Sequence, residues 1–387
     1  MKAVFVHDHN FVHDKKNDII YDGSGGAFDK HLWNRYLKIF DHLTVVGREV
    51  EKLPNNLVNS TAPDVQFELF NIEITAKNFL FNDRIIVDKL TQIINSNDFA
   101  ILRLPSRLGS LGVDICRKIN KKYVLEIVGD PFEAYWYHGH WAGKILAPFE
   151  LYRLKSLVKK SSYNIYVTNS ILQKRYPSKF NSIGISNVRL ESLIDNERIL
   201  HYYKSDYDKI KIGLIGSFHV KYKGHIEALK ALKSLILMGY NNLELNLVGT
   251  GDSNWVLTLA EELGVLKHIK IIGALKSGLN GIFPFLDDMH IYIHPSRTEG
   301  LPRVILEAMS RGRMCLGSNV GGTSELLAPE YIHKAGDWKK LTKQIFQLIE
   351  LSKNEKLDIG QKNRLKASEY LEKALQTKRE NFIKGIL

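Results

Sequence analysis

The sequence lacks several features that mark particular classes of protein. It has two cysteines among 387 residues, and Cys116 and Cys315 stand too far apart to form a metal-binding pattern, which argues against a disulfide scaffold or a zinc module. No apolar run approaches the roughly 20 residues of a membrane-spanning helix. The apolar start at residues 3–6 is too short for the core of a signal peptide. We therefore expect a cytoplasmic protein with reduced thiols.

Internal repeats, low-complexity segments and concentrated charge are also missing. The net charge is +12, but the excess is spread evenly over the two halves of the chain, so it does not indicate a nucleic-acid-binding domain. Solubility alone explains such a charge. A positive protein would also favour anionic substrates or an anionic membrane surface.

Short apolar strands alternate with helical patterns throughout, which is typical of parallel α/β sheets. A chain of 387 residues favours two domains over one core. In the first half we expect strands at 3–6, 43–46, 99–104, 123–128 and 165–168, with a helix at 27–40. In the second half we expect strands at 211–216, 243–248, 269–272 and 289–293, with helices at 225–238 and 254–263. The polar stretch 190–208 is the predicted linker.

The most informative segment covers residues 294–309. A buried strand ends here, a turn containing Gly300 and Pro302 follows, and apolar residues then recur at helical spacing. Gly300 permits a close approach of the backbone, and Pro302 suits the first helical position. Glu299 therefore stands just before a helix N-terminus, and Glu307 lies within the helix.

The two glutamates indicate hydroxyl recognition at this helix end. A helix N-terminus attracts phosphate, whereas carboxylates beside it would repel phosphate. Glu299 and Glu307 therefore suit the hydroxyl groups of a sugar or ribose that is attached to the phosphate. Taken alone, a helix cap and a solvated helix face would explain the pair as well.

Two glycine-containing loops add phosphate-binding candidates. Residues 216–224 follow a strand and precede a helix, which places Lys223 at the carboxyl ends of strands, where a diphosphate would lie. Gly25 and Gly26 follow the first strand, and their backbone N–H groups could approach phosphate or sugar. This second loop lacks the G-x-G-x-x-G spacing of a dinucleotide site, and a flexible turn explains it nearly as well.

With these motifs in order, the chain resembles the retaining glycosyltransferases of the GT4 family (glycosyl transferases group 1). Glu299 and Glu307 match its E-x7-E signature, and residues 321–326 are similar to its GG-x-x-E-L turn and helix. The resemblance implies the GT-B fold, with two doubly wound Rossmann-like domains facing each other across a cleft. The acceptor-side domain would cover residues 1–200 and the nucleotide-sugar domain residues 205–366, with a final helix at about 367–387 packing back on the first domain.

The resemblance also implies roles for individual residues. Glu307 would hold the ribose hydroxyls, Glu299 the donor sugar and Lys223 the donor diphosphate. The other residues of the implied donor site are Gly25, Gly26, Ser217, Gly273, Gly300, Leu301, Pro302 and Arg303. Ser217 stands where the family commonly has an arginine, so we expect Arg303 or Lys221 to replace that cation.

Asp130 ends a predicted strand where many family members carry a histidine that touches the donor sugar. We predict that Asp130 contacts a sugar hydroxyl and joins Glu299 and Lys223 as a catalytic residue; an Asp-Pro turn is the alternative. His7, Asp8 and His9 could suggest a metal site, but they follow a strand, and no completing ligand stands at a persuasive spacing. The resemblance implies no metal and no other cofactor, since cationic side chains neutralise the diphosphate.

The activity implied is hexosyl transfer from a nucleotide-diphosphate sugar to an acceptor hydroxyl. Residues 166–177 are similar to bacterial surface-polysaccharide transferases (capsule, O-antigen or exopolysaccharide), which suggests a saccharide or lipid-linked saccharide acceptor. A GT-B sugar-nucleotide epimerase and a non-catalytic nucleotide-binding protein stay open as alternatives. Residues 144–160 predict a basic amphipathic helix, which favours peripheral contact with the inner face of the cell membrane; a crossover helix with a solvated face is the alternative.

Overall fold

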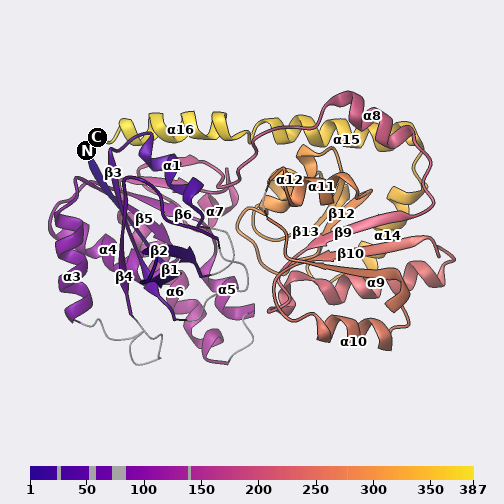
Figure 1. Cartoon of the computed structure of the whole chain (residues 1–387), viewed down its shortest axis with the longest axis horizontal. Helices are drawn as coiled ribbons and strands as arrows, with labels where there is room; N and C mark the ends of the chain where they lie inside the picture. The colour runs from indigo at the N-terminus through magenta and orange to yellow at the C-terminus, as the bar shows by residue number, and fades with distance from the viewer. Residues whose placement is uncertain (24–27, 52–57, 72–83, 138–140, 277) are drawn as a thin grey trace. The chain divides into compact units, whose positions relative to one another are not determined.

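The computed structural model describes residues 1–23, 28–51, 58–71, 84–137, 141–276 and 278–387 (Figure 1). The chain divides into two compact units. Unit 1 comprises Met1–Pro131, Pro148–Ile185 and Gln376–Leu387, and unit 2 comprises Phe132–Ala147 and Ser186–Leu375. Each unit is built around a mainly parallel β-sheet.

Within the described residues, the sheet of unit 1 has eight strands in the order β4-β3-β1-β5-β6-β7-β8, with β2 paired to β1. The β1–β2 pair is antiparallel and the other pairs are parallel. The strands are β1 (Lys2–Asp14), β2 (Ile19–Asp22), β3 (His42–Glu49), β4 (Val65–Phe70), β5 (Phe99–Leu104), β6 (Tyr123–Ile127), β7 (Tyr163–Tyr166) and β8 (Asn181–Gly184).

The helices described between residues 1 and 185 connect these strands. They are α1 (Lys30–Leu37), α3 (Arg84–Asn95), α4 (Arg107–Lys118), α5 (Pro131–Tyr137), α6 (Trp141–Lys160) and α7 (Ile171–Arg175). α1 is shorter than the predicted helix at 27–40 because Asp29 caps it, accepting a hydrogen bond from the N–H of Leu32 at 3.2 Å. Among the described residues, no helix is both long and apolar enough to cross a bilayer.

The sheet of unit 2 has six parallel strands in the order β11-β10-β9-β12-β13-β14. They are β9 (Ile210–Ile215), β10 (Leu243–Val248), β11 (Ile269–Gly273), β12 (Ile291–His294), β13 (Met314–Ser318) and β14 (Ile332–His333). Its helices are α8 (Asn196–Lys204), α9 (His225–Leu237), α10 (Asn254–Glu262), α11 (Ile282–Asp287), α12 (Arg303–Ser310), α13 (Thr323–Leu326), α14 (Trp338–Glu350) and α15 (Lys353–Ser368), with short 3-10 turns η1 (Lys221–Lys223), η2 (Leu266–His268) and η3 (Pro329–Tyr331).

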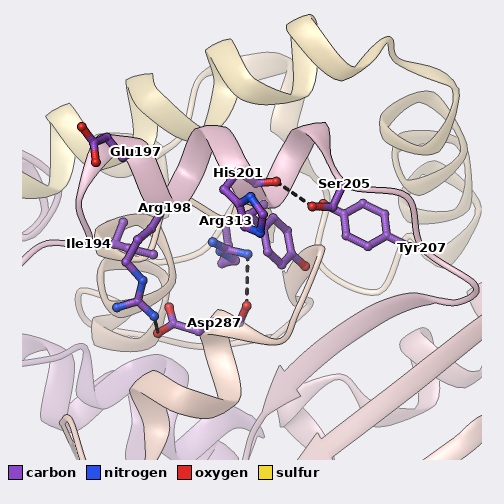
Figure 2. Close-up of a pocket in the computed structure, with 9 residues that line it drawn as sticks. Ile194, Glu197, Arg198, His201, Ser205, Tyr207, Asp287 and Arg313 are labelled. Atoms are coloured by element: carbon purple, nitrogen blue, oxygen red, sulfur yellow. Dashed lines mark hydrogen bonds and ion pairs between the residues drawn. The ribbon is translucent and has the colours of Figure 1, made fainter.

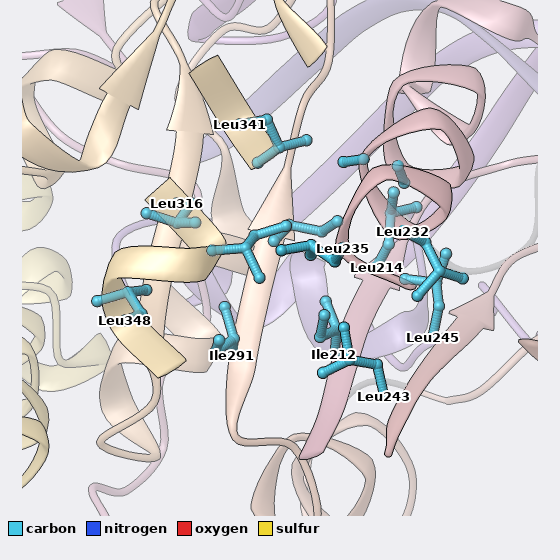
Figure 3. Close-up of a cluster of buried hydrophobic side chains, with 14 of the residues drawn as sticks. Ile212, Leu214, Leu232, Leu235, Leu243, Leu245, Ile291, Leu316, Leu341 and Leu348 are labelled. Carbon is cyan, nitrogen blue, oxygen red and sulfur yellow. The ribbon is translucent and has the colours of Figure 1, made fainter. Parts of the chain in front are cut away.

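The core of unit 2 lies between the sheet and the helices packed on it. Figure 3 shows leucines of α9 and α14, among them Leu235 and Leu348, meeting strand residues such as Leu245 and Ile291. These side chains are almost fully shielded from solvent. Burial of this apolar surface anchors the strands, whose carboxyl ends carry the loops described below.

The predicted linker at 190–208 contains α8, whose Ile199 and Tyr203 are buried in the core of unit 2. In this part of the chain, unit 1 therefore ends at Ile185 and unit 2 begins at Ser186. The predicted final helix from about residue 367 is also interrupted, because α15 ends at Ser368 and α16 (Glu372–Lys384) begins after Leu371, which pairs with Leu190.

The last segment of the chain belongs to unit 1. In Figure 1, α16 lies beside α1, and the Gln376 amide donates a hydrogen bond to the Arg35 carbonyl at 2.9 Å. Arg379 is almost completely buried, and its positive charge acts on Glu126 in the polar interior of unit 1. Residues 376–387 thus contribute side chains to the interior of unit 1.

Candidate active site

The loops that follow β9 and β12 meet at the carboxyl edge of the unit 2 sheet. The N–H of Arg297 donates to the Tyr222 carbonyl at 2.8 Å. Gly224 has φ +86°, and a Cβ there would lie 2.3 Å from the carbonyl oxygen of Pro295. This close backbone approach requires glycine, and it brings Lys223 beside Glu299.

Glu299 is held by two donors on the same oxygen. Lys223 Nζ lies 2.7 Å from Glu299 Oε1, and His294 Nε2 lies 2.8 Å from that oxygen. The hydroxyl of Tyr292 lies 3.1 Å from His294 Nδ1 on the other side of the ring. Tyr292 orients the His294 ring, and His294 and Lys223 together fix the position of the Glu299 carboxylate, just as hydrogen bonds from neighbouring residues orient the groups that bind a ligand.

The electrostatics of the pair favour charge on both partners. Burial by itself would raise the pKa of Glu299, but the neighbouring Lys223 ammonium and His294 ring hold that pKa far below its ordinary value. Burial likewise opposes the charge of Lys223, and Glu299 reverses the effect and raises the lysine's pKa. At neutral pH Glu299 is therefore a carboxylate and Lys223 an ammonium.

Glu307 lies in a different electrostatic environment. It is the fifth residue of α12, and its side chain is buried. Burial raises its pKa from the ordinary 4.5 to about 7, and the charges of Arg303 and Arg189 offset this only in part. The two glutamates of the signature thus differ: Glu299 is firmly ionised, and Glu307 titrates near neutral pH.

The predicted glycine pair at 321–322 packs against the loop that carries Glu299 and Gly300. Gly322 N–H donates to the Gly300 carbonyl at 2.6 Å. Gly321 has φ +48°, and a Cβ there would come within 2.2 Å of the Glu299 carbonyl oxygen. The backbone of Glu299 and Gly300 therefore rests directly on the glycine turn, and Leu301 is buried beside it.

One detail of the predicted helix start is wrong. Pro302 precedes α12 as its cap residue with ψ 96°, and the helix begins at Arg303. An extended ψ at Pro302 cannot belong to a helix, so the first helical side chain is the arginine. Arg303 is exposed at this helix start, and its charge reaches both Lys223 and Glu307.

The remaining predicted residues of unit 2 line neighbouring loops. The Ser217 hydroxyl contacts the Thr250 carbonyl at 3.2 Å and so links the loops after β9 and β10. Gly273 ends β11 with φ +82°, and its carbonyl accepts from Gly249 N–H at 2.9 Å. The Lys221 ammonium lies 5.8 Å from the centre of the Trp255 ring. Lys221 thus lies beside an aromatic face, whereas Arg303 stands at the start of α12.

The site residues predicted in the first half of the chain belong to unit 1 or fall outside the described residues. Asp130 is buried there, accepts a hydrogen bond from the Tyr176 hydroxyl at 2.6 Å and pairs with Arg175. These contacts hold the end of α7 against the loop that follows β6. Gly25 and Gly26 lie outside the residues that the structure describes.

Unit 2 also contains a cavity of about 490 Å³ that lies away from these loops (Figure 2). Its lining includes Tyr207 before β9 and Asp287 before β12, so it opens near the amino ends of the strands. Figure 2 shows Arg198 pointing at Asp287, at 4.0 Å, and Arg311 binds the same carboxylate at 2.7 Å. None of the predicted site residues lines this cavity.

In the described ranges, no group of three His, Cys, Asp or Glu side chains could hold a metal ion. Of the residues around His7, Asp8 and His9, His9 lies 2.8 Å from Asp22, and Asp8 accepts from the N–H of Leu108 at 2.9 Å. These polar groups serve the packing of unit 1.

The sequence interpretation assigned no role to His294, Tyr292 or Arg189. His294 ends a buried strand five residues before Glu299, and Tyr292 lies two residues earlier in that strand. This position next to the signature was the available signal for both residues. Arg189 lies far from the signature in sequence, and only the packing of unit 2 brings its charge near Glu307.

Two mainly parallel α/β units, with Lys223 and Glu299 on loops of the second and Glu307 on α12, are typical of glycosyltransferases with the GT-B fold. Residues 209–351 match the family described as Glycosyl transferases group 1. The chain is 39% identical over 386 residues to Protein CapJ of Staphylococcus aureus. The matched region covers 98% of this chain and 94% of the relative. The chain therefore belongs to the glycosyl transferases group 1 family.

A further relative and a solved structure are also similar to the chain. The capsular polysaccharide biosynthesis glycosyltransferase CapH of Staphylococcus aureus is 26% identical over 170 residues, 42% of this chain and 43% of the relative. The structure of HepE from Anabaena in complex with UDP-glucose has a TM-score of 0.69 at 16% identity, covering 100% of both chains. The chain is thus related to staphylococcal capsular polysaccharide biosynthesis proteins, and its fold is that of GT-B enzymes.

Proposed function

We propose that the protein is a retaining, GT4-type hexosyltransferase that moves a sugar from a nucleotide-diphosphate sugar to an acceptor hydroxyl in the synthesis of a bacterial capsular polysaccharide. The observation that carries this proposal is the Lys223–Glu299–His294 arrangement at the carboxyl edge of the unit 2 sheet. The relationship to the capsular polysaccharide biosynthesis glycosyltransferase CapH supports the pathway class, and the complexes of HepE with UDP and UDP-glucose support a nucleotide-sugar donor.

Lys223 and the start of α12 would stabilise the departing diphosphate. The Lys223 ammonium is balanced by Glu299 at 2.7 Å. A diphosphate gains negative charge as the glycosidic bond breaks, so it attracts this ammonium most strongly in the transition state. Arg303 at the α12 N-terminus adds a second positive group, in place of the arginine missing at Ser217. These cations make a metal unnecessary in this proposal.

Glu299 would bind the donor sugar as a carboxylate. Its depressed pKa makes it a poor general acid. Lys223 and His294 both bind Oε1, so Oε2 is the oxygen we assign to a sugar hydroxyl. The negative charge also favours the oxocarbenium-like transition state of glycosyl transfer. Retention then requires the acceptor to attack on the face of the leaving phosphate, with a phosphate oxygen taking its proton.

Glu307 would accept hydrogen bonds from the ribose hydroxyls in its ionised form. Asp130 stays a predicted sugar contact; its pairing with Arg175 and Tyr176 also gives it a packing role within unit 1. Gly273 would add a backbone contact with the donor, and the donor contacts of Gly25 and Gly26, which lie outside the described residues, stay predictions. We assign the acceptor to the class of saccharides or lipid-linked saccharides, with the enzyme working at the inner face of the membrane.

A donor screen that measures release of nucleoside diphosphate tests the proposal. We expect release from one nucleotide sugar in the presence of acceptor, with the anomeric configuration of the sugar kept in the product. K223A should lower kcat/KM about a hundredfold or more, as for the loss of a group that stabilises transition-state charge. K230A, which removes an exposed lysine of α9, is the control. Absence of nucleotide-sugar binding, an inverted product, or equal activity of K223A and wild type would contradict the proposal.

A further inference from the structure

The exposed side of α6 carries a row of large apolar side chains. Trp141 is 69% exposed, Ile145 66%, Phe149 55% and Tyr152 70%. Their spacing of four, four and three residues places them on one face of the helix. Such a row on a helix surface is unusual for a soluble protein, whose exposed apolar groups are normally scattered singly.

The opposite side of α6 is already used by the fold. Ala147, Leu154, Leu157 and Val158 are buried. A crossover helix needs one apolar stripe to pack on its sheet. The exposed row is therefore a second apolar stripe that core packing does not require, and this favours a binding role over the solvated face of an ordinary crossover helix.

Positive charge accompanies this second stripe. Lys144, Lys155, Lys159 and Lys160 are exposed on the same helix. The helix has one carboxylate, Glu150, which is buried at 9% exposure and lies 3.6 Å from Arg153. The solvent-facing side of α6 therefore offers lysines, aromatic rings and aliphatic groups but no negative side chain.

We propose that this face of α6 binds the surface of an anionic lipid bilayer. Trp141 and Tyr152 suit the boundary between headgroups and acyl chains, where aromatic residues concentrate. Ile145 and Phe149 would enter the acyl boundary, and the lysines would meet lipid phosphates. A second copy of the chain is a poorer partner, because it also carries a net charge of +12. The proposal rests on the proposed function, since a lipid-linked acceptor would be presented at this surface.

Flotation of the full-length protein with phosphatidylglycerol vesicles tests the proposal, with phosphatidylcholine vesicles as the neutral comparison. The wild type should float with phosphatidylglycerol at low salt, float far less with phosphatidylcholine, and be released by raised salt. I145S/F149S should lower the bound fraction about tenfold or more, since it removes two apolar anchors. L237S on α9, where Leu237 is 77% exposed, should float like the wild type.

The lysines are tested by K144Q/K155Q, with K230Q on α9 as the control. The double variant should lose its preference for phosphatidylglycerol, and the control should keep it. Failure of the wild type to float at low salt would overturn the proposal, as would equal losses in variants and controls. Dimerisation that I145S/F149S abolishes would overturn it as well. Nucleoside diphosphate release by I145S/F149S, measured with a water-soluble acceptor, should match the wild type, so a failed membrane contact and a failed glycosyl transfer are distinguishable.

Discussion

Replacing Glu307 by glutamine is expected to stabilise the protein at pH 8 while weakening nucleotide-sugar binding. Burial raises the pKa of Glu307 to about 7, and Arg303 and Arg189 lower it only in part. At pH 8 the folded protein therefore holds a buried carboxylate that is poorly compensated. Glutamine keeps the shape of the side chain and removes that charge.

The magnitude follows from the difference between the folded and unfolded pKa values. In the unfolded chain the carboxyl titrates near 4.5, and in the folded protein near 7. Between these values the folded state binds a proton that the unfolded state has lost, so the free energy of unfolding falls as the pH rises. A pKa difference of about 2.5 corresponds to about 3 kcal/mol lost by pH 8. E307Q should escape this loss, and its advantage over the wild type should vanish below pH 4.5.

Urea unfolding of both proteins at several values between pH 4.5 and 8 measures this effect. Glu262→Gln on α10 is the control, because that carboxylate is exposed. The expected result is a gap between E307Q and wild type that widens with pH, together with a weaker affinity of E307Q for the donor. Parallel pH curves, or an E307Q protein less stable than wild type at pH 8, would refute the reasoning.

Three other substitutions probe separate parts of the structure. G224A adds a Cβ 2.3 Å from the Pro295 carbonyl at a φ of +86° and should destabilise by about 2 kcal/mol or more, seen as a lower Tm than wild type. R103M leaves the buried Glu126 carboxylate without the guanidinium that binds it at 2.9 Å and should cost about 3–5 kcal/mol by urea unfolding. H294A removes one of the two groups that hold the Glu299 carboxylate and should lower kcat about tenfold or more with a smaller change in KM. An unchanged kcat would show that His294 does not position Glu299 for catalysis.

Much of the fold was predictable because the buried strands are continuous apolar runs between turn residues. The strands expected at 99–104 and 243–248 are β5 and β10 with the same limits. β2, β4, β8, β13 and β14 were missed; of these, β4 and β8 lie at the edges of the unit 1 sheet and β14 lies at an edge of the unit 2 sheet. An edge strand is buried less than a central one, so its apolar pattern is weak; β8 is also only four residues long.

The site was predictable in outline and not in its contacts. Parallel strands end at one edge of a sheet, which is why Lys223 and Glu299 were expected near each other although 76 residues separate them. Their ion pair depends on the backbone contact between Gly224 and Pro295, which no local pattern encodes. The raised pKa of Glu307 likewise depends on burial, and burial follows from packing over the whole unit.

The last helix has a consequence for how the protein is made. Residues 376–387 leave the ribosome only after residues 1–375, yet they supply Gln376 and the buried Arg379 to unit 1. Until they emerge, the nascent unit 1 lacks a cation that acts on Glu126. Domains generally fold as units, with the N-terminal one first during synthesis. Here the sheet of unit 1 should stay incompletely stabilised until residues 376–387 have emerged, and a fragment that stops before residue 376 should depend on chaperones more than one that includes these residues.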